Sequence, residues 1–255
     1  MSKVKDIKLK IIPSSMANPF IKKWHYSGKV VNNSKLHFGA FLCDELHGVM
    51  SFGSPIDKSK VLHLVETENK GINQKWNEML ELNRMAFDPF LPRNSESRCI
   101  GVAFRIIKAK YPQIKWILSF ADGTQCGDGA IYRASGFKLS LIKKNSDLFE
   151  CEDGTQIHSM TIKTSKKLRN KYGTWKNALL QTHGQFAKIE GFQLRYIKIL
   201  DESSKLTVPE IPFSKIAEIG AGMYKGIKRE PISTDSSFPV EKGGANPTLT
   251  LQKSL

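Results

Sequence analysis

Two residues capable of acid–base chemistry flank a glycine-rich turn in the middle of the chain. Asp122 follows the apolar run 114–120, and a carboxylate at the carboxyl end of a buried strand can accept a proton or orient an amine. Tyr132 lies in a short predicted helix over 130–134, where its phenol can donate a proton to a leaving group. The alternatives are that Asp122 caps the turn and that Tyr132 is a half-buried core residue.

A second group of residues is suited to binding an anionic donor. Arg98, Gly101 and Ala103 form an R-x-x-G-x-A pattern at the start of a predicted helix, where backbone N–H groups point at an anion and a glycine permits close approach. The alternative for Gly101 is a tight contact between helix and sheet. Arg84 interrupts an otherwise apolar predicted strand and needs an anionic partner, either an external ligand or the nearby Glu81.

The pattern of apolar residues predicts the elements that position these groups. A strand, a helix and a second strand follow one another through residues 81–120, and this βαβ unit requires an at least partly parallel sheet. Residues 54–78 are polar and are expected to run across the surface. The other expected elements are strands at 7–11, 36–43, 46–52, 137–143, 158–164 and 192–200, and helices at 14–24, 130–134 and 174–185. The pattern predicts an α/β protein.

Composition limits the class of protein and its partners. The 255 residues include 39 Lys and Arg against 24 Asp and Glu, and the net charge of +15 favours a polyanion such as nucleic acid over the alternative, an anionic membrane. The sequence contains no run of roughly 18 apolar residues, so no membrane span is predicted. The four cysteines are widely spaced, without a C-x-x-C pair, and favour a reducing, cytoplasmic location.

The strongest local charge bias lies between residues 155 and 200, which include nine Lys and Arg but one acidic residue. We expect a basic insertion at about 155–190 that holds a nucleic-acid backbone, with Tyr172 and Trp175 nearby. The alternative is a solvated basic face. Residues 229–255 are rich in Ser, Pro and Gly and are predicted to form an extended or disordered tail. The candidate backbone-binding residues are Lys163, Lys166, Lys167, Arg169 and Lys171.

The order of the motifs across residues 81–143 resembles the GNAT acyltransferase superfamily. In that superfamily a helix start after one strand cradles the acyl donor, and a Y-x-x-x-G-F stretch follows the next strand, as it does here from Tyr132. The resemblance implies a GNAT-like catalytic domain over residues 1–228, with a mixed, partly parallel central sheet flanked by helices. The helix start contains the single Gly101 and departs from the glycine-rich form of the superfamily.

A more specific set of motifs resembles the phage Mom family, over roughly residues 24–137 plus the tail. The resemblance implies modification of adenine in phage DNA to N6-carbamoylmethyladenine, in the cytoplasm of a bacterial host, which protects the DNA from restriction enzymes. The motifs are His25-Tyr26-Ser27, Glu81-Leu82-x-Arg84, Ser95-x-Ser97, Ser119-Phe120-Ala121-Asp122, Gly129-x-Ile131-Tyr132 and Gly243-Gly244-Ala245-x-Pro247-Thr248-x-x-Leu251.

Within this resemblance the matching residues have expected roles. Asp122 is the base that activates adenine N6, and Tyr132 is the acid or orienting group. Arg84 and Ser97 line the donor site, while His25 and Tyr26 hold an extruded base or supply metal ligation. The alternative for His25 is a packed surface residue. The remaining histidines show no metal-ligand spacing, so no metal is predicted, although the family resemblance leaves iron open.

The structure of the implied product constrains the donor. A carbamoylmethyl group places a glycinamide on C6 of the base, and acetyl transfer alone leaves one of its nitrogens unexplained. Glycyl transfer to N6 followed by rearrangement accounts for every atom, so we expect an activated glycyl ester, naturally glycyl-tRNA. A coenzyme A thioester is the alternative donor. The expected partners are DNA as acceptor and tRNA as donor, and a homodimer is left open. The rival functions are an ordinary GNAT N-acetyltransferase acting on a protein or small amine, and a non-catalytic nucleic-acid-binding protein.

Overall fold

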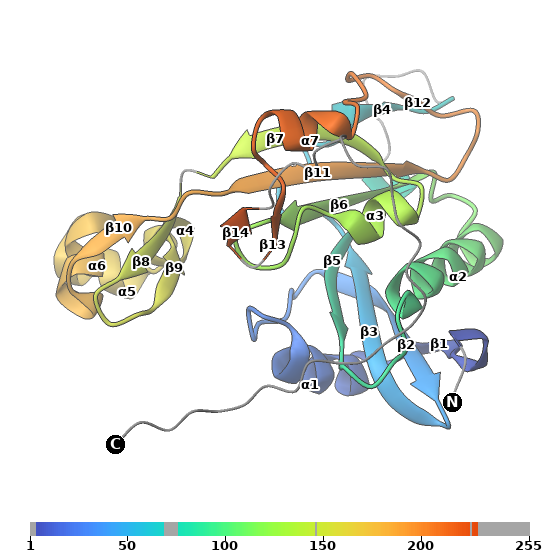
Figure 1. Cartoon of the computed structure of the whole chain (residues 1–255), viewed down its shortest axis with the longest axis horizontal. Helices are drawn as coiled ribbons and strands as arrows, with labels where there is room; N and C mark the ends of the chain where they lie inside the picture. Colours follow the sequence, from blue (N-terminus) through green and yellow to red (C-terminus); the bar gives the residue numbers. More distant parts are fainter. Residues whose placement is uncertain (1–3, 69–75, 146, 225, 229–255) are drawn as a thin grey trace, which may run out of the picture.

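The computed structural model describes residues 4–68, 76–145, 147–224 and 226–228. Its centre is a seven-stranded sheet in the order β1-β2-β3-β5-β6-β11-β7 (Figure 1). Every neighbouring pair in this sheet is antiparallel except β5 and β6, which are parallel. The fold is therefore α/β with a mixed, partly parallel sheet, as the sequence predicts.

Strands that are consecutive in sequence build the first half of the sheet. The two residues that join β2 to β3, Cys43 and Asp44, both have positive φ, which matches the right-handed twist of a tight hairpin. Ala17 and Ile21 of α1 are buried against the sheet. A short 3-10 helix, Val4–Asp6, precedes these elements. They are β1 (Lys8–Ile12), α1 (Ser14–Trp24), β2 (Ser34–Leu42) and β3 (Glu45–Gly53).

The predicted βαβ unit is confirmed as β5 (Met79–Phe87), α2 (Ser95–Lys110) and β6 (Trp116–Asp122). The parallel pairing of β5 with β6 ends at Glu81 opposite Leu118. Immediately afterwards β5 bulges at Asn83, where its register against β3 shifts. From this point β5 continues along β3 and β6 continues along β11, so the sheet opens between the two parallel strands.

The remaining elements complete the sheet and its core. β11 (Phe192–Ile199) inserts between β6 and β7 (Lys138–Lys144), and α3 (Ala130–Ala134) lies between β6 and β7 in the chain. Two short elements follow, α7 (Ser214–Glu218) and the hairpin of β13 (Met223–Tyr224) and β14 (Ile227–Lys228). The main core joins the sheet to residues of α2 at helical spacing: Cys99, Ile100, Ala103, Phe104 and Ile107.

A smaller lobe is inserted between β7 and β11 and lies at one end of the molecule (Figure 1). Its own core contains Cys151, Ile162, Ala178 and Leu179. The predicted strand over 158–164 is wrong, because these residues form mainly α4, in which Ser159 and Ile162 are buried three residues apart. The elements of the lobe are β8 (Leu148–Cys151), β9 (Gln156–His158), α4 (Ser159–Lys163), α5 (Lys166–Tyr172), α6 (Trp175–His183) and β10 (Phe186–Lys188).

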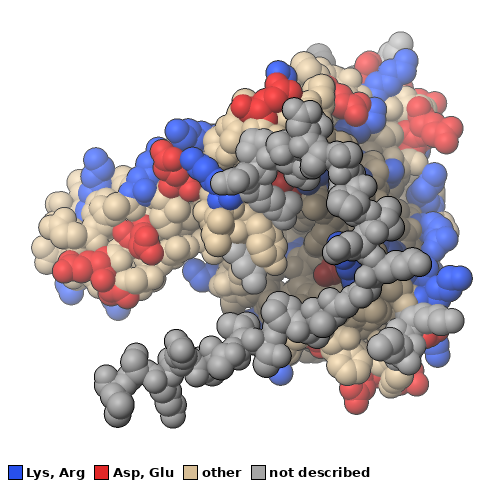
Figure 2. Space-filling model, viewed as in Figure 1, with Lys and Arg blue, Asp and Glu red and all other residues tan. Residues whose placement is uncertain are grey.

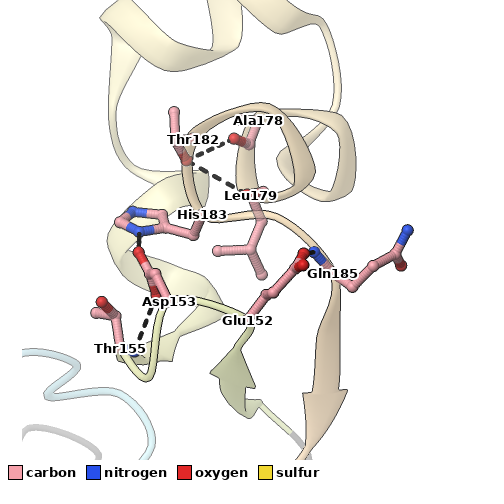
Figure 3. Close-up of polar contacts among 8 residues, drawn as sticks. All are labelled: Glu152, Asp153, Thr155, Ala178, Leu179, Thr182, His183 and Gln185. Carbon is pink, nitrogen blue, oxygen red and sulfur yellow. Dashed lines mark hydrogen bonds and ion pairs between the residues drawn. The ribbon is translucent and has the colours of Figure 1, made fainter.

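Polar contacts join the end of α6 to the turn between β8 and β9 (Figure 3). His183 Nδ1 lies 2.7 Å from Asp153 Oδ2, and this carboxyl has its pKa lowered to about 2, chiefly by that hydrogen bond. The backbone N–H of Gln185 donates to Glu152 Oε2 over 3.0 Å. These contacts hold the helical layer of the lobe against its three-stranded sheet.

Part of the segment predicted to run across the surface is instead in the core. Val61, Leu64 and Val65 are buried with Trp116 in a second cluster on the sheet. A hydrophobic cluster of this kind overrides the polar character of the flanking residues. The elements here are the 3-10 helices Leu62–Leu64 and Trp76–Glu78, and β4 (Val65–Glu66), which pairs with β12 (Lys205–Leu206). Across the described part of the chain, no helix is both long and apolar enough to cross a membrane.

Candidate active site

A cavity of about 620 Å³ lies at the opening between β5 and β6. The two separated strands supply much of its wall, and the loop after β6, α3 and the end of α1 supply the rest. Five predicted residues from four separate segments line it together: His25, Tyr26, Arg84, Asp122 and Tyr132. The geometry of the parallel pair explains the cavity, because strands that part after three paired positions leave an open space in the sheet.

Asp122 is the last residue of β6 and lines the cavity. Its Oδ1 accepts the backbone N–H of Thr124 over 3.0 Å and also the Thr124 hydroxyl. Its backbone carbonyl accepts the N–H of Cys126 over 2.8 Å. Asp122 therefore caps the turn after β6, the alternative that the sequence left open, and the same contacts fix its carboxyl group at the cavity wall.

Tyr132 is 9% exposed and lines the cavity from α3. Its ring packs on Phe137 and Tyr196, with centroid distances of 5.2 and 5.3 Å. Burial raises the pKa of the Tyr132 phenol to about 12, and the adjacent Ser119 hydroxyl opposes the rise. The phenol is therefore protonated at neutral pH. This residue combines the two roles considered from the sequence, since it belongs to the core and presents a proton donor to the cavity.

His25 ends α1, and its ring is held in one orientation. Nδ1 accepts the backbone N–H of Ser27 over 3.2 Å, and the Ser27 hydroxyl lies 2.9 Å from the same nitrogen. Burial, aided by the charge of Arg84, lowers the pKa of His25 to about 4. The imidazole is therefore neutral at pH 7, and because Nδ1 is an acceptor, its proton is on Nε2. His25 can donate a hydrogen bond into the site but is a weak base.

Tyr26 stacks on the His25 ring at a centroid distance of 4.3 Å and is 53% exposed. Restricted contact with water at the cavity wall raises the pKa of its phenol well above the usual range, and Cys126 and Asp122 add to the effect. The electrostatic influence of Asp122 on Tyr26 shows that the α1 side and the β6 side of the cavity are close to one another.

Arg84 does not form an ion pair with Glu81 among the described contacts. Its Nε donates to the carbonyl oxygen of Lys29 over 2.9 Å, and Nη1 donates to that of Asn83 over 2.7 Å. Arg84 thus ties the bulge of β5 to the loop after α1 while its charge stays at the cavity. Burial raises the pKa of Glu81, which lines the cavity where β5 and β6 part.

The residues predicted from the start of α2 lie outside the lining of this cavity, to which the helix contributes Glu96. Ala103 is fully buried in the core and has no side-chain surface for a donor. Arg98 is turned away, and its Nη2 donates to the carbonyl of Lys5 over 3.4 Å. Ser97 donates to the carbonyl of Asn94 over 3.2 Å. A Cβ at Gly101 would meet no atom within 4 Å, so this glycine is not needed for a helix–sheet contact.

The predicted nucleic-acid-binding residues divide into two kinds. Lys163 lies 3.1 Å from Asp147 Oδ1 and 5.1 Å from the centre of the Trp175 ring, so it has partners within the lobe. The four others are exposed on α5: Lys166, Lys167, Arg169 and Lys171. On the face shown in Figure 2 the lobe carries both acidic and basic side chains.

Several cavity residues lacked a sequence signal. Cys126 and Gln125 lie in the loop after β6, and Tyr224 comes from the C-terminal hairpin. Nothing in the spacing around Tyr224 connects it to a site a hundred residues earlier, although the glycine-rich turn marked the region of Cys126. Among the described residues, no group of three or more His, Cys, Asp or Glu side chains is arranged to hold a metal ion.

The mixed sheet and its lined opening define an α/β protein with a ligand-sized cavity between two parallel strands. The chain matches the model of the Mom protein family over residues 6–215, and it belongs to this family. Methylcarbamoylase mom of Escherichia phage Mu is 34% identical to it over 204 residues, which is 79% of this chain and 78% of the phage protein.

Solved structures with similarity to this fold include acetyltransferases. The Bacillus subtilis acetyltransferase in complex with CoA is 13% identical, with a TM-score of 0.38 over 76% of this chain and 97% of that one. An N-acetyltransferase from Staphylococcus aureus Mu50 is 10% identical, with a TM-score of 0.42 over 76% of this chain and 99% of that one.

Proposed function

We propose that this protein modifies DNA by converting adenine to N6-carbamoylmethyladenine. The observation that carries the proposal is the cavity, which brings Asp122 and Tyr132 together with His25 and Tyr26 in a chain of the Mom family. Its relative from phage Mu bears the name methylcarbamoylase, which matches transfer of such a group. A carboxylate and a protonated phenol at one cavity are suited to group transfer to a weakly basic amine.

The residues have distinct roles in this proposal. The lone pair of adenine N6 is delocalised into the ring, so Asp122 acts as the base that removes a proton from N6 as the new bond forms. Tyr132, protonated at neutral pH, donates a proton to the leaving group. His25 donates from Nε2 toward the carbonyl oxygen of the donor, where negative charge develops.

A glycyl ester accounts for the product. N6 attacks the ester carbonyl, the ester oxygen leaves with a proton, and N6 becomes the nitrogen of a glycyl amide. The free glycyl amine then attacks C6 through a five-membered ring, and the bond from C6 to the original N6 breaks. The product is C6–NH–CH2–CO–NH2, in which the glycyl nitrogen is bonded to C6 and the original N6 is the terminal amide. Glycyl-tRNA is the natural donor of this type, and a coenzyme A thioester is the conventional alternative.

The polyanionic substrates give the lobe a role as well. The exposed residues Lys166, Lys167, Arg169 and Lys171 on α5 provide positive charge for a phosphate backbone. The base to be modified must leave the duplex stack or belong to a single strand before it can enter a cavity of this size. The proposal therefore separates backbone binding by the lobe from chemistry at the sheet opening.

Isotope labelling tests the donor and the rearrangement together. Cells that express the protein are fed glycine labelled with 15N and 13C, and the modified nucleoside is fragmented in a mass spectrometer. We expect both glycine carbons and its nitrogen in the product, with the 15N retained when the terminal amide is lost as ammonia. Modified adenine without glycine label would exclude the glycyl route, and 15N in the terminal amide would exclude the rearrangement.

A further inference from the structure

The C-terminal hairpin of β13 and β14 contributes an aromatic side chain to the cavity. Tyr224 lines the cavity and is 51% exposed. It lies beyond residues 6–215, the part of the chain that matches the family model, so that match assigns it no role. Its position therefore has to be understood from the structure alone.

The hairpin is attached to the loop between β6 and α3 by backbone contacts. Tyr224 forms an isolated antiparallel bridge with Gly127, and the N–H of Gly226 donates to the carbonyl of Gly123 over 3.1 Å. Met223 is 2% exposed, and a Cβ at Gly123 would lie 2.8 Å from the Met223 Cβ. The loop glycines thus allow the hairpin to approach closely, and the hairpin holds Tyr224 in a defined place.

The Tyr224 ring itself rests against this loop. A Cβ at Gly127 would lie 3.4 Å from Cδ2 of the ring, so the glycine lets the ring lie close to the backbone. The ring is supported there, yet half of the residue remains exposed and it borders the cavity. A ring with one supported side and one open side is suited to stacking on a flat ligand.

Tyr26 stands on the opposite side of the opening. It follows α1, which packs against β5, whereas the hairpin of Tyr224 is attached to the loop after β6. Both tyrosines line the cavity and both are about half exposed, at 53% and 51%. The catalytic candidates Asp122 and Tyr132 line the same cavity.

We propose that Tyr224 is a stacking residue that holds the adenine base in the cavity; this inference rests on the proposed function. An extruded or single-stranded base is held by stacking on aromatic side chains, because every base presents a flat π face. The hairpin places Tyr224 at the rim of the opening, where a base enters. The residue positions the base and takes no part in proton transfer.

Binding measured without any donor separates this inference from the chemistry. The full-length protein is titrated with a short single-stranded DNA that contains one adenine, and with the same strand carrying an abasic site at that position. We expect the wild type to prefer the adenine strand and Tyr224→Ala to lose roughly 5- to 150-fold of its affinity for that strand alone. Tyr224→Phe keeps the ring and should keep the preference. Ile227→Ala, in the same hairpin at a residue 73% exposed, is the matched control.

Three results would overturn the inference: an undiminished preference for adenine in Tyr224→Ala, an equal loss in Tyr224→Phe, or no preference in the wild type. The proposed function is judged separately, by the presence of modified adenine in DNA exposed to the wild-type protein. If modified adenine forms while Tyr224→Ala binds the adenine strand normally, the inference about Tyr224 fails and the proposed function stands.

Discussion

The neutral state of His25 makes the stability of the fold depend on pH in a way that can be worked out. Burial lowers its pKa from 6.5 to about 4 in the folded protein, while the unfolded chain keeps the ordinary value. Between these two values the unfolded state binds more protons, so stability rises with pH. The contribution is fully present above pH 6.5 and is lost as the pH falls to about 4. A pKa difference of this size corresponds to at most about 3 kcal/mol, and solvent screening of the part-exposed ring reduces it.

The substitution His25→Asn isolates this contribution. The amide oxygen of Asn can accept the Ser27 N–H in place of Nδ1, but the side chain does not titrate. Urea unfolding at pH 7, 5.5 and 4.5 should show that the variant loses less stability on acidification than the wild type, by up to about 3 kcal/mol. His37, whose pKa burial also lowers, is unchanged in both proteins and cancels in the comparison. His63→Asn, at an exposed position, should keep the wild-type slope. Equal slopes for His25→Asn and wild type would refute the neutral buried imidazole.

Three further predictions address the site, the backbone and the lobe. Tyr132→Phe should slow modification by roughly 100- to 10,000-fold in a single-turnover assay while changing stability by less than about 1 kcal/mol; an unaffected rate would remove the phenol from the chemistry. Gly129→Ala adds a Cβ that would lie 2.3 Å from a tyrosine ring, so it should cost roughly 1–3 kcal/mol more than Gly154→Ala, which also has positive φ but open space; calorimetry of the pair decides. Lys167→Glu with Lys171→Glu should weaken DNA binding and flatten its salt dependence without altering the product; unchanged binding would exclude this face.

The sequence predicts the main architecture because its strongest signals are local. The hairpin, the βαβ unit and the strand that became β11 each have an apolar pattern that one segment carries by itself. The strand predicted over 158–164 failed because a short alternation fits either period, and packing within the lobe selected a helix with Ser159 and Ile162 inside. Val61 and Leu64 are buried by contacts with Trp116, which no local pattern reveals.

The candidate site was predictable where residue type and element boundary coincide. Asp122 at the end of an apolar strand and Tyr132 after a glycine-rich turn both line the cavity. The positions of Arg98 and Ala103 depend on the rotation of α2 about its axis, and that rotation directs them to Lys5 and to the core. Tyr224 depends on a hairpin docking to a distant loop. The tail motif at residues 243–251 lies outside the described residues.

The central claim is that the cavity at the sheet opening modifies adenine through Asp122. The most direct measurement is mass spectrometry of nucleosides from the DNA of cells that express the protein, compared with cells that express Asp122→Asn at a matched level. Asn retains an oxygen for the Thr124 contacts, so the variant should remain folded, which circular dichroism checks. We predict a carbamoylmethyl mass increase on deoxyadenosine with the wild type and its loss with the variant. Unmodified DNA from the folded wild type, or equal modification by the variant, would contradict the claim.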